Sequence, residues 1–154
     1  MIEKRLVTNW VETTLSTATN MPVGQGRAPV TGQAPPFHLL YSVDTSLSGA
    51  PYADLNEDAS FVYQITHVSG PDPNVAQSTA DSDQLEWMAD AARKAFLGRA
   101  PDTGLWLHPM AINGISCMTR SLEVEWGQQP GGTSEQEAAI MTYVQRFRFN
   151  LTPA

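Results

Sequence analysis

Two segments near the end of the chain alternate apolar and charged side chains, which restricts both to extended strands. The apolar residues are at even positions in residues 121–126 and at odd positions in residues 141–151, the period of a half-buried strand. One antiparallel register sets apolar against apolar and acid against base: Leu122–Phe149, Val124–Phe147, Glu123–Arg148 and Glu125–Arg146. Each facing pair of opposite charges stabilises a ladder by up to about 1 kcal/mol. The sequence therefore predicts that these strands are antiparallel neighbours.

Two more strands and two helices are predicted upstream. Residues 37–43 and 59–68 are strand candidates, the first a short apolar run and the second an alternating one. Residues 2–20 and 81–97 carry apolar side chains at helical spacing. The order helix, strand, strand, helix, strand, strand predicts an α+β fold in a single domain, residues 1–154. Its mostly antiparallel sheet would carry the N-terminal helix and the long second helix packed on it.

The two predicted helices differ in how their faces can be used. The second has Asp81 placed to cap its start and Gly98 to end it. The first has two apolar rows, Ile2–Leu6–Trp10 and Val7–Val11–Leu15. So broad an apolar arc indicates contact with two surfaces. These are either two layers of one domain or a core and a partner.

An extended Gly/Pro arm, residues 20–36, joins the first helix to the first strand. Gly24 and Gly26 suggest a phosphate-binding loop, but a dinucleotide loop lies between a strand and a helix, whereas this one precedes a strand. Pro29 also removes an amide where a phosphate needs a donor. The arm is therefore interpreted as a connector, in which Arg27 is the first candidate for an ion pair to a neighbouring subunit. A second projecting segment is expected at residues 127–139, a flexible hairpin tip.

The net charge of −7 is unevenly distributed, because residues 28–92 contain no Lys or Arg and nine acids. This field repels the phosphates of nucleic acids. It is either a solubilising face or a wall that DNA passes without binding. In the second interpretation the residues predicted to face the DNA are Asp54, Glu57 and Asp58.

No set of residues predicts catalysis or a cofactor. The acidic run from Asp54 lacks the glycine and the terminal glutamate of a calcium loop. The three histidines are far apart in sequence and are interpreted as ordinary polar residues, and the one cysteine, Cys117, as a structural residue. No apolar run approaches the roughly 20 residues of a membrane-spanning helix, and the N-terminus lacks the apolar stretch of a signal peptide. We therefore expect a chain made in the cytosol, without enzymatic activity, metal or cofactor.

Three stretches in order carry a resemblance to a family: PPFHLLYSVD, YADLNEDASFVYQITHVSG and QLEWMADAARKAFLGR. With the preceding helix and arm, they resemble the tail terminator proteins of long-tailed (siphovirus) bacteriophages, especially those of actinobacterial hosts. The resemblance covers roughly residues 10–99, and the last strand more loosely. It implies a small α+β protomer that forms a homohexameric ring in the virion, at the head–tail junction, after assembly in the host cytoplasm. The family has no enzymatic activity and no obligatory cofactor.

The resemblance also implies partners and surfaces. Such a ring ends polymerisation of the tail tube, binds the tail tube protein and offers the surface to which a head–tail connector or stopper protein attaches. DNA passes through the lumen without specific binding. A ring needs two different complementary patches on each protomer, and the predicted interface residues are Val7, Val11, Val23, Arg27 and Pro29. The alternatives are another head–tail connector component, such as a stopper or head-completion protein, and an enzyme or ligand binder whose site is built from distant residues.

Overall fold

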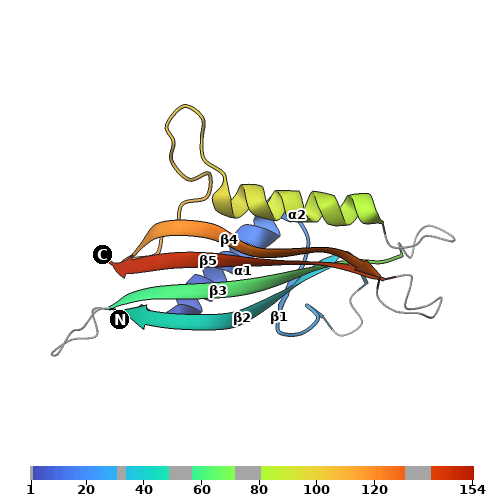
Figure 1. The fold of residues 1–154 in the computed structure, drawn as a ribbon, viewed down its shortest axis with the longest axis horizontal. Coiled ribbons are helices and arrows are strands. Elements are labelled where there is room, and N and C mark those ends of the chain that lie inside the picture. The colour runs from blue at the N-terminus through green and yellow to red at the C-terminus, as the bar shows by residue number, and fades with distance from the viewer. Residues whose placement is uncertain (1, 31–33, 49–56, 72–80, 131–139) are drawn as a thin grey trace.

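The computed structural model describes residues 2–30, 34–48, 57–71, 81–130 and 140–154. These residues form an α+β domain with two helices and a five-stranded, mostly antiparallel sheet (Figure 1). The elements in chain order are α1 (Lys4–Thr19), β1 (Val23–Gln25), β2 (Phe37–Ser48), β3 (Asp58–Ser69), α2 (Ser82–Leu97), β4 (Ile115–Pro130) and β5 (Met141–Pro153). The strands lie in the order β1-β2-β3-β5-β4, and only β1 runs parallel to its neighbour. The predicted fold class is confirmed, and the element order differs from the predicted one only by the added short strand β1.

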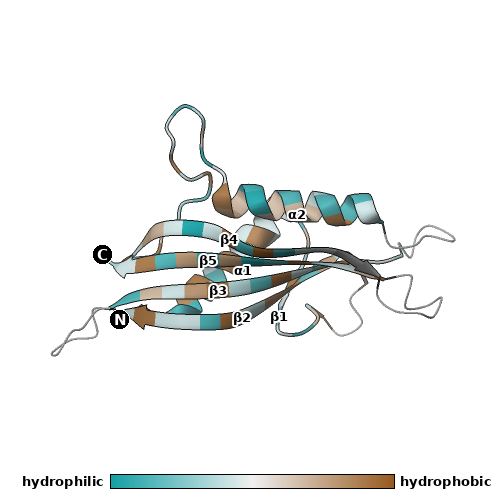
Figure 2. Cartoon of the chain, viewed as in Figure 1, coloured by the Kyte–Doolittle hydropathy of each residue, from teal (hydrophilic) through white to brown (hydrophobic). Residues whose placement is uncertain are grey.

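Both helices pack on one face of the sheet, so the molecule has two layers (Figure 1). Tyr63 of β3 faces Phe147 of β5 in the ladder, and both side chains are fully buried. Thr8 of α1 lies 2.9 Å from the Tyr63 hydroxyl, and the ring of Phe96 in α2 lies 5.1 Å from that of Phe147. Because these contacts come from α1 and α2 to the same side of adjacent strands, the two helices share one core. Along β5, buried and partly exposed side chains alternate from Gln145 to Leu151, and the strands in Figure 2 show apolar and polar residues in succession.

The structure decides between the two interpretations of the first helix. Val7, Val11 and Leu15 have no exposed surface and belong to the main core. In the other apolar row, Trp10 packs edge-on to Phe149 at 5.9 Å, while Leu6 is 43% exposed. The broad apolar arc of α1 therefore serves two layers of one domain. The prediction that Val7 and Val11 contact a partner subunit is wrong, because the chain's own sheet and helix already cover both side chains.

The ends of the helices follow their sequence signals. Asp81 caps α2 by accepting a hydrogen bond from the amide of Asp83 at 2.9 Å, as predicted. Gly98 closes the same helix, and its amide donates to the Lys94 carbonyl at 2.9 Å. The first helix ends at Asn20, which adopts a left-handed conformation with φ of 53°, a conformation that asparagine tolerates better than most residues.

The pairing of β4 with β5 is confirmed, but its register differs from the predicted one. Leu122 faces Phe147 instead of Phe149, and Val124 faces Arg146 instead of Phe147. Register shifts occur at three places along β4, between Cys117 and Thr119, between Leu122 and Val124, and between Glu125 and Gln128. Each extra residue turns the following side chains to the other face of the strand. Strand β4 also continues to Pro130, so the start of the predicted tip at 127–139 is strand, and residues 131–139 lie outside the described residues.

The Gly/Pro arm contributes a strand that the sequence analysis did not predict. β1 pairs parallel with β2, with Gly24 beside Leu39. The amide of Gly26 donates to the Leu40 carbonyl at 2.9 Å, which extends this pairing. A Cβ atom on Gly24 would lie 1.8 Å from the Arg27 carbonyl oxygen, so only glycine permits the tight turn that follows. The base of the arm is therefore part of the chain's own sheet.

Candidate functional site: the arm groove and a buried histidine network

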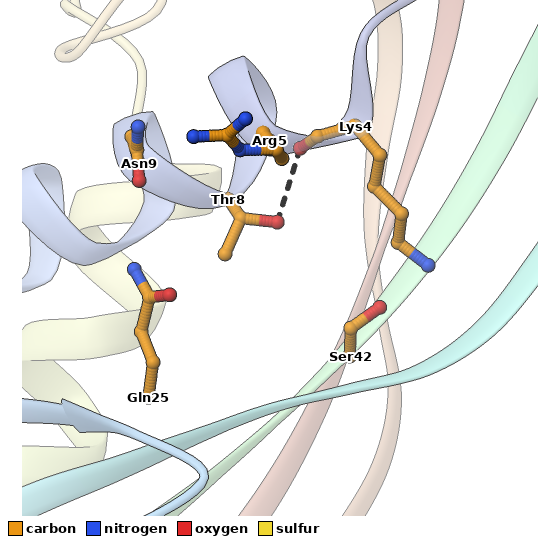
Figure 3. Close-up of a pocket in the computed structure, with 6 residues that line it drawn as sticks. All are labelled: Lys4, Arg5, Thr8, Asn9, Gln25 and Ser42. Atoms are coloured by element: carbon orange, nitrogen blue, oxygen red, sulfur yellow. Dashed lines mark hydrogen bonds between the residues drawn. The ribbon is translucent and has the colours of Figure 1, made fainter.

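A polar groove of about 420 Å³ lies between α1 and the first two strands (Figure 3). Its lining residues are Lys4, Arg5, Thr8, Asn9, Gln25 and Ser42. Lys4 donates a hydrogen bond to Thr45 on β2, and Gln25 of β1 donates to Glu12 of α1. These contacts fix the walls of the groove, while Arg5 is exposed at its edge.

The same groove continues along the arm. A second hollow of about 510 Å³ shares Gln25 with the first and reaches Arg27 and Pro29. Arg27 is exposed, Pro29 and Val23 are half-buried, and Val30 is 61% exposed. Of the five residues predicted to form an interface, Val23, Arg27 and Pro29 line this second hollow, and Val23 also packs against the core. Val7 and Val11 are buried elsewhere. Whether the three arm residues contact a neighbouring subunit remains a prediction.

The acidic residues predicted to face a lumen are only partly described. Glu57 and Asp58 are half-buried at the start of β3. Asp54 lies outside the described residues. These two carboxylates are neighbours because they are adjacent in sequence. Their proposed position facing DNA in a lumen stays a prediction.

A chain of buried polar side chains crosses the core from α1 to β4. Thr19 Oγ1 lies 2.9 Å from His38 Nε2, and His38 Nδ1 lies 2.8 Å from His67 Nδ1. His67 Nε2 lies 2.7 Å from Gln145 Oε1. The amide of Gln145 donates to the Ala89 carbonyl at 3.2 Å and to Glu125 Oε1 at 2.8 Å. These bonds join six elements of the fold: α1, β2, β3, α2, β4 and β5.

The hydrogen bonds of this network assign the protons of the two neutral imidazoles. The amide group of Gln145 donates to two oxygens, so its own oxygen must accept from Nε2–H of His67. His67 Nδ1 is then an acceptor, and Nδ1–H of His38 donates to it. His38 Nε2 is then an acceptor, so the single proton of the Thr19 hydroxyl is shared between it, at 2.9 Å, and the Leu15 carbonyl, at 2.8 Å. Along the path from Thr19 through His38, His67 and Gln145 to Glu125, each group thus donates to the next, an arrangement in which both imidazoles are neutral.

Burial also favours the neutral form of both histidines. Neither side chain is exposed. Desolvation lowers the pKa of His38 to about 3, helped by the charge of His67. Desolvation also lowers the pKa of His67 to about 4, against the opposing effects of Gln145 and Glu125. At neutral pH the network holds two uncharged rings, so His38 and His67 are core residues and not the ordinary polar residues of the sequence interpretation.

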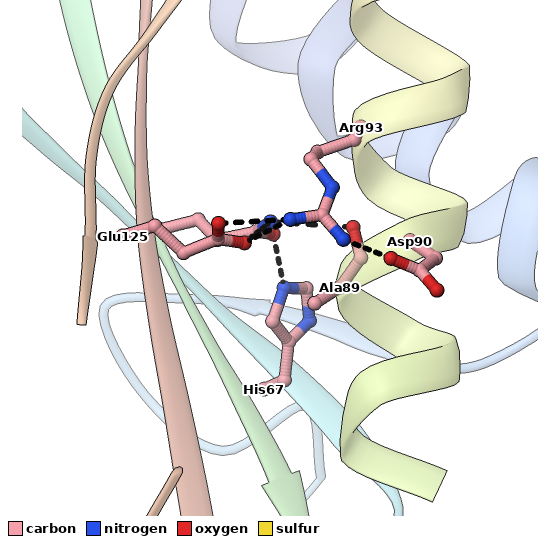
Figure 4. Close-up of polar contacts among 6 residues, drawn as sticks. His67, Ala89, Asp90, Arg93 and Glu125 are labelled. Atoms are coloured by element: carbon pink, nitrogen blue, oxygen red, sulfur yellow. Dashed lines mark hydrogen bonds and ion pairs between the residues drawn. The ribbon is translucent and has the colours of Figure 1, made fainter. Parts of the chain in front are cut away.

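At its far end the network meets an ion pair (Figure 4). Both carboxylate oxygens of Glu125 accept from Arg93 Nη1, at 2.6 and 2.8 Å, and Arg93 also pairs with Asp90. The predicted pairing of Glu125 with Arg146 is therefore wrong. The bulge before Val124 turns Glu125 toward α2. Arg146, on the open face, donates to Gln64 at 3.0 Å and lies over the ring of Trp126.

The other predicted cross-strand pair is confirmed. Arg148 Nε donates to Glu123 Oε1 at 2.5 Å, although the residue facing Arg148 in the ladder is Ser121. The long side chains span the difference in register. Both partners are partly exposed, so this ion pair contributes little to stability.

A second cluster holds the loop after α2. The rings and guanidinium groups stack alternately in the order Arg99, Trp106, Arg120, Trp10. The guanidinium carbon of Arg99 is 3.7 Å from the centre of the Trp106 ring, and that of Arg120 is 4.4 Å from it. Arg120 is only 8% exposed and donates to the Phe96 carbonyl at 3.1 Å. This Arg–Trp stack attaches the loop to the core.

The described residues show how the candidate metal ligands and the one cysteine lie. Within them, no three His, Cys, Asp or Glu side chains come close enough to hold a metal ion. Cys117 is half-buried, and its thiol points to the Thr119 carbonyl. No helix in the described ranges is long and apolar enough to cross a membrane.

No protein-family model matches the chain, and no curated protein is similar to it. The inference about function therefore rests on the residues themselves.

Proposed function

We propose that this chain is a structural protein of a phage tail, which forms a ring at the head-proximal end of the tail tube. In this role it ends polymerisation of the tube and provides the surface that joins head to tail. The protomer would assemble in the host cytoplasm and remain at the head–tail junction of the virion. Its partners would be further copies of itself, most simply in a homohexamer, the tail tube protein and a connector or stopper protein.

The observation that carries this proposal is the order of elements around the three resembling stretches. A helix, an arm whose base pairs with β2, two long antiparallel strands, a capped helix and two further strands follow one another in the order that the resemblance implies. The exposed arm and the exposed acidic side of α2 are chemically different patches, which head-to-tail closure of a ring needs.

The charge of the chain supports passage of DNA without binding. No Lys or Arg occurs in residues 28–92. Of the four basic residues on β4, β5 and the loop before them, Arg99 and Arg120 stack on Trp106, Arg148 pairs with Glu123, and Arg146 contacts Gln64 and Trp126. Cations engaged in this way are less available to phosphates.

The direct test is polymerisation of purified tail tube protein with and without this chain, followed by electron microscopy. We expect shorter tubes with a ring at one end only. Tubes of unchanged length and with bare ends would overturn the proposal. If the chain ignores tubes but binds filled heads, then the stopper alternative replaces it.

A further inference from the structure

The outer side of α2 bears a hollow of about 370 Å³ that the fold leaves unfilled. Its apolar walls are Ala18 of α1, Trp87, Ala91 and Ala95 of α2, and Leu107 of the following loop. Trp87 is 49% exposed and Leu107 39% exposed. Asp90, Lys94 and His108 complete the rim. Exposed aromatic side chains beside a concavity are typical of protein contacts.

The hollow is preformed, because the loop that makes its far wall is fixed in several places. The amide of Leu107 donates to the Gly98 carbonyl at 3.0 Å, and Arg99 pairs with Trp106 in an antiparallel bridge. A Cβ atom on Gly98 would lie 2.7 Å from Leu107 Cδ1, so the loop packs directly on the end of α2. A wall that is already ordered costs little conformational entropy when something binds against it.

The arm of the same chain has the shape and charge of a suitable occupant. Its base is fixed to the sheet through β1, and the turn at Gly24 presents residues 27–30 outward. Val30 is an apolar side chain with 61% of its surface exposed, and Arg27 is exposed three residues before it. Neither has a place in the chain's own core.

Charge complementarity favours this pairing. The exposed side of the first half of α2 carries Asp83, Glu86 and Asp90 around Trp87, spaced along about 10 Å of helix. Helix α2 has no Lys or Arg before Arg93, which pairs with Asp90. An arm with a single arginine followed by an apolar residue therefore matches an acidic helix beside an apolar hollow.

We propose that residues 27–30 of one copy dock on α2 of a second copy, with Val30 in the hollow beside Trp87 and Arg27 against the acidic side of the helix. The arm and the hollow are different surfaces, so the contact is head-to-tail and each copy can donate one arm and accept another. This inference rests on the proposed ring and names the contact that closes it.

Cysteine cross-linking between two pools of the full chain tests the contact. In a Cys117→Ser background, one pool carries Val30→Cys and the other Ala91→Cys. We expect a disulfide-linked dimer only when the pools are mixed and oxidised. A matched control replaces Ala91→Cys with Thr13→Cys, an exposed position on the outer side of α1, and should give no dimer.

Native mass spectrometry of Val30→Asp and Trp87→Ala separates this inference from the ring proposal. We expect each substitution to raise, by at least tenfold, the protein concentration at which half of the chain is monomeric. Oligomers that persist in both variants, with no dimer from the mixed pools, would overturn the arm contact and leave the ring standing. A disulfide formed within a chain that carries both cysteines, at high dilution, would also overturn it. A chain that is monomeric throughout and never cross-links would overturn both.

Discussion

The Nδ1 atoms of His38 and His67 lie 2.8 Å apart in the core, on strands that place the two residues directly opposite each other. The pair links α1, through Thr19, to Gln145 and the Glu125–Arg93 ion pair. A hydrogen-bonded chain of this length adds no apolar burial, but it fixes which side chains meet across the layers.

The first prediction concerns acid. Folding lowers the pKa of His38 from 6.5 to about 3 and that of His67 from 6.5 to about 4. The unfolded chain therefore binds protons first, and stability that is complete above pH 6.5 falls as the pH drops toward 4. At about pH 5 the loss amounts to about 2 kcal/mol for each histidine. Urea unfolding across this range measures it.

The charged groups that face His67 are Glu125 of β4, which raises its pKa, and Arg93 of α2, which lowers it. The control is His108→Gln, outside the network, which should keep the full pH dependence. Stability that stays constant from neutral pH to about pH 5 would show that the two rings are not buried as neutral groups.

The second prediction compares two glutamates on β4. Glu125→Ala removes the acceptor of Arg93 and of Gln145, and we expect a loss of about 1.5–3 kcal/mol in the free energy of unfolding. Glu123→Ala breaks only the exposed pair with Arg148 and should cost less than about 1 kcal/mol. Chemical denaturation of both variants measures the difference, and equal losses would contradict the assigned contacts.

The third prediction concerns the turn of the arm. Gly24→Ala must displace the Arg27 carbonyl, because the added Cβ would lie 1.8 Å from its oxygen. We expect a loss of about 1–3 kcal/mol. Gly26→Asn is the matched control, since Gly26 has φ of 69° and open space around it, and asparagine tolerates that conformation. A variant Gly24→Ala as stable as Gly26→Asn would refute the turn.

The fourth prediction concerns the loop after α2. Trp106→Ala removes the ring between Arg99 and the buried Arg120, and we expect a loss of at least about 2 kcal/mol. Trp126→Ala removes a ring that stacks on Arg146 and is 46% exposed, so its loss should be about 0.5–1 kcal/mol. Thermal unfolding of both variants ranks them, and the reverse order would contradict the stack.

Sequence patterns are sufficient to predict the α+β class, the caps of α2 and the pairing of β4 with β5. The class and the pairing follow from the alternation or helical spacing of apolar residues within each element, and the caps follow from the residue types at the two ends of the helix. Such patterns are insufficient for the register, since bulges such as the one between Leu122 and Val124 change the facing residues without a signal in the alternation. β1 was missed because Val23–Gln25 is short and lies among glycines and prolines. The histidine network was missed for a related reason: His38 and His67 become neighbours only through the β2–β3 register.

The same limit applies to the candidate interface. Apolar spacing alone did not distinguish Val7 and Val11, which are buried, from an exposed residue such as Val30. Only the packing of the sheet under α1 separates core from surface. The exposed remainder, Arg27 and Val30, is what the proposed assembly uses.

The central claim is that the chain closes into a ring that binds tail tube protein. Native mass spectrometry of the purified chain, alone and mixed with tail tube protein, tests it most directly. The account predicts a closed oligomer, most simply of six copies, that adds tube protein without dissociating. A chain that stays monomeric at every concentration and binds no tube protein would contradict it.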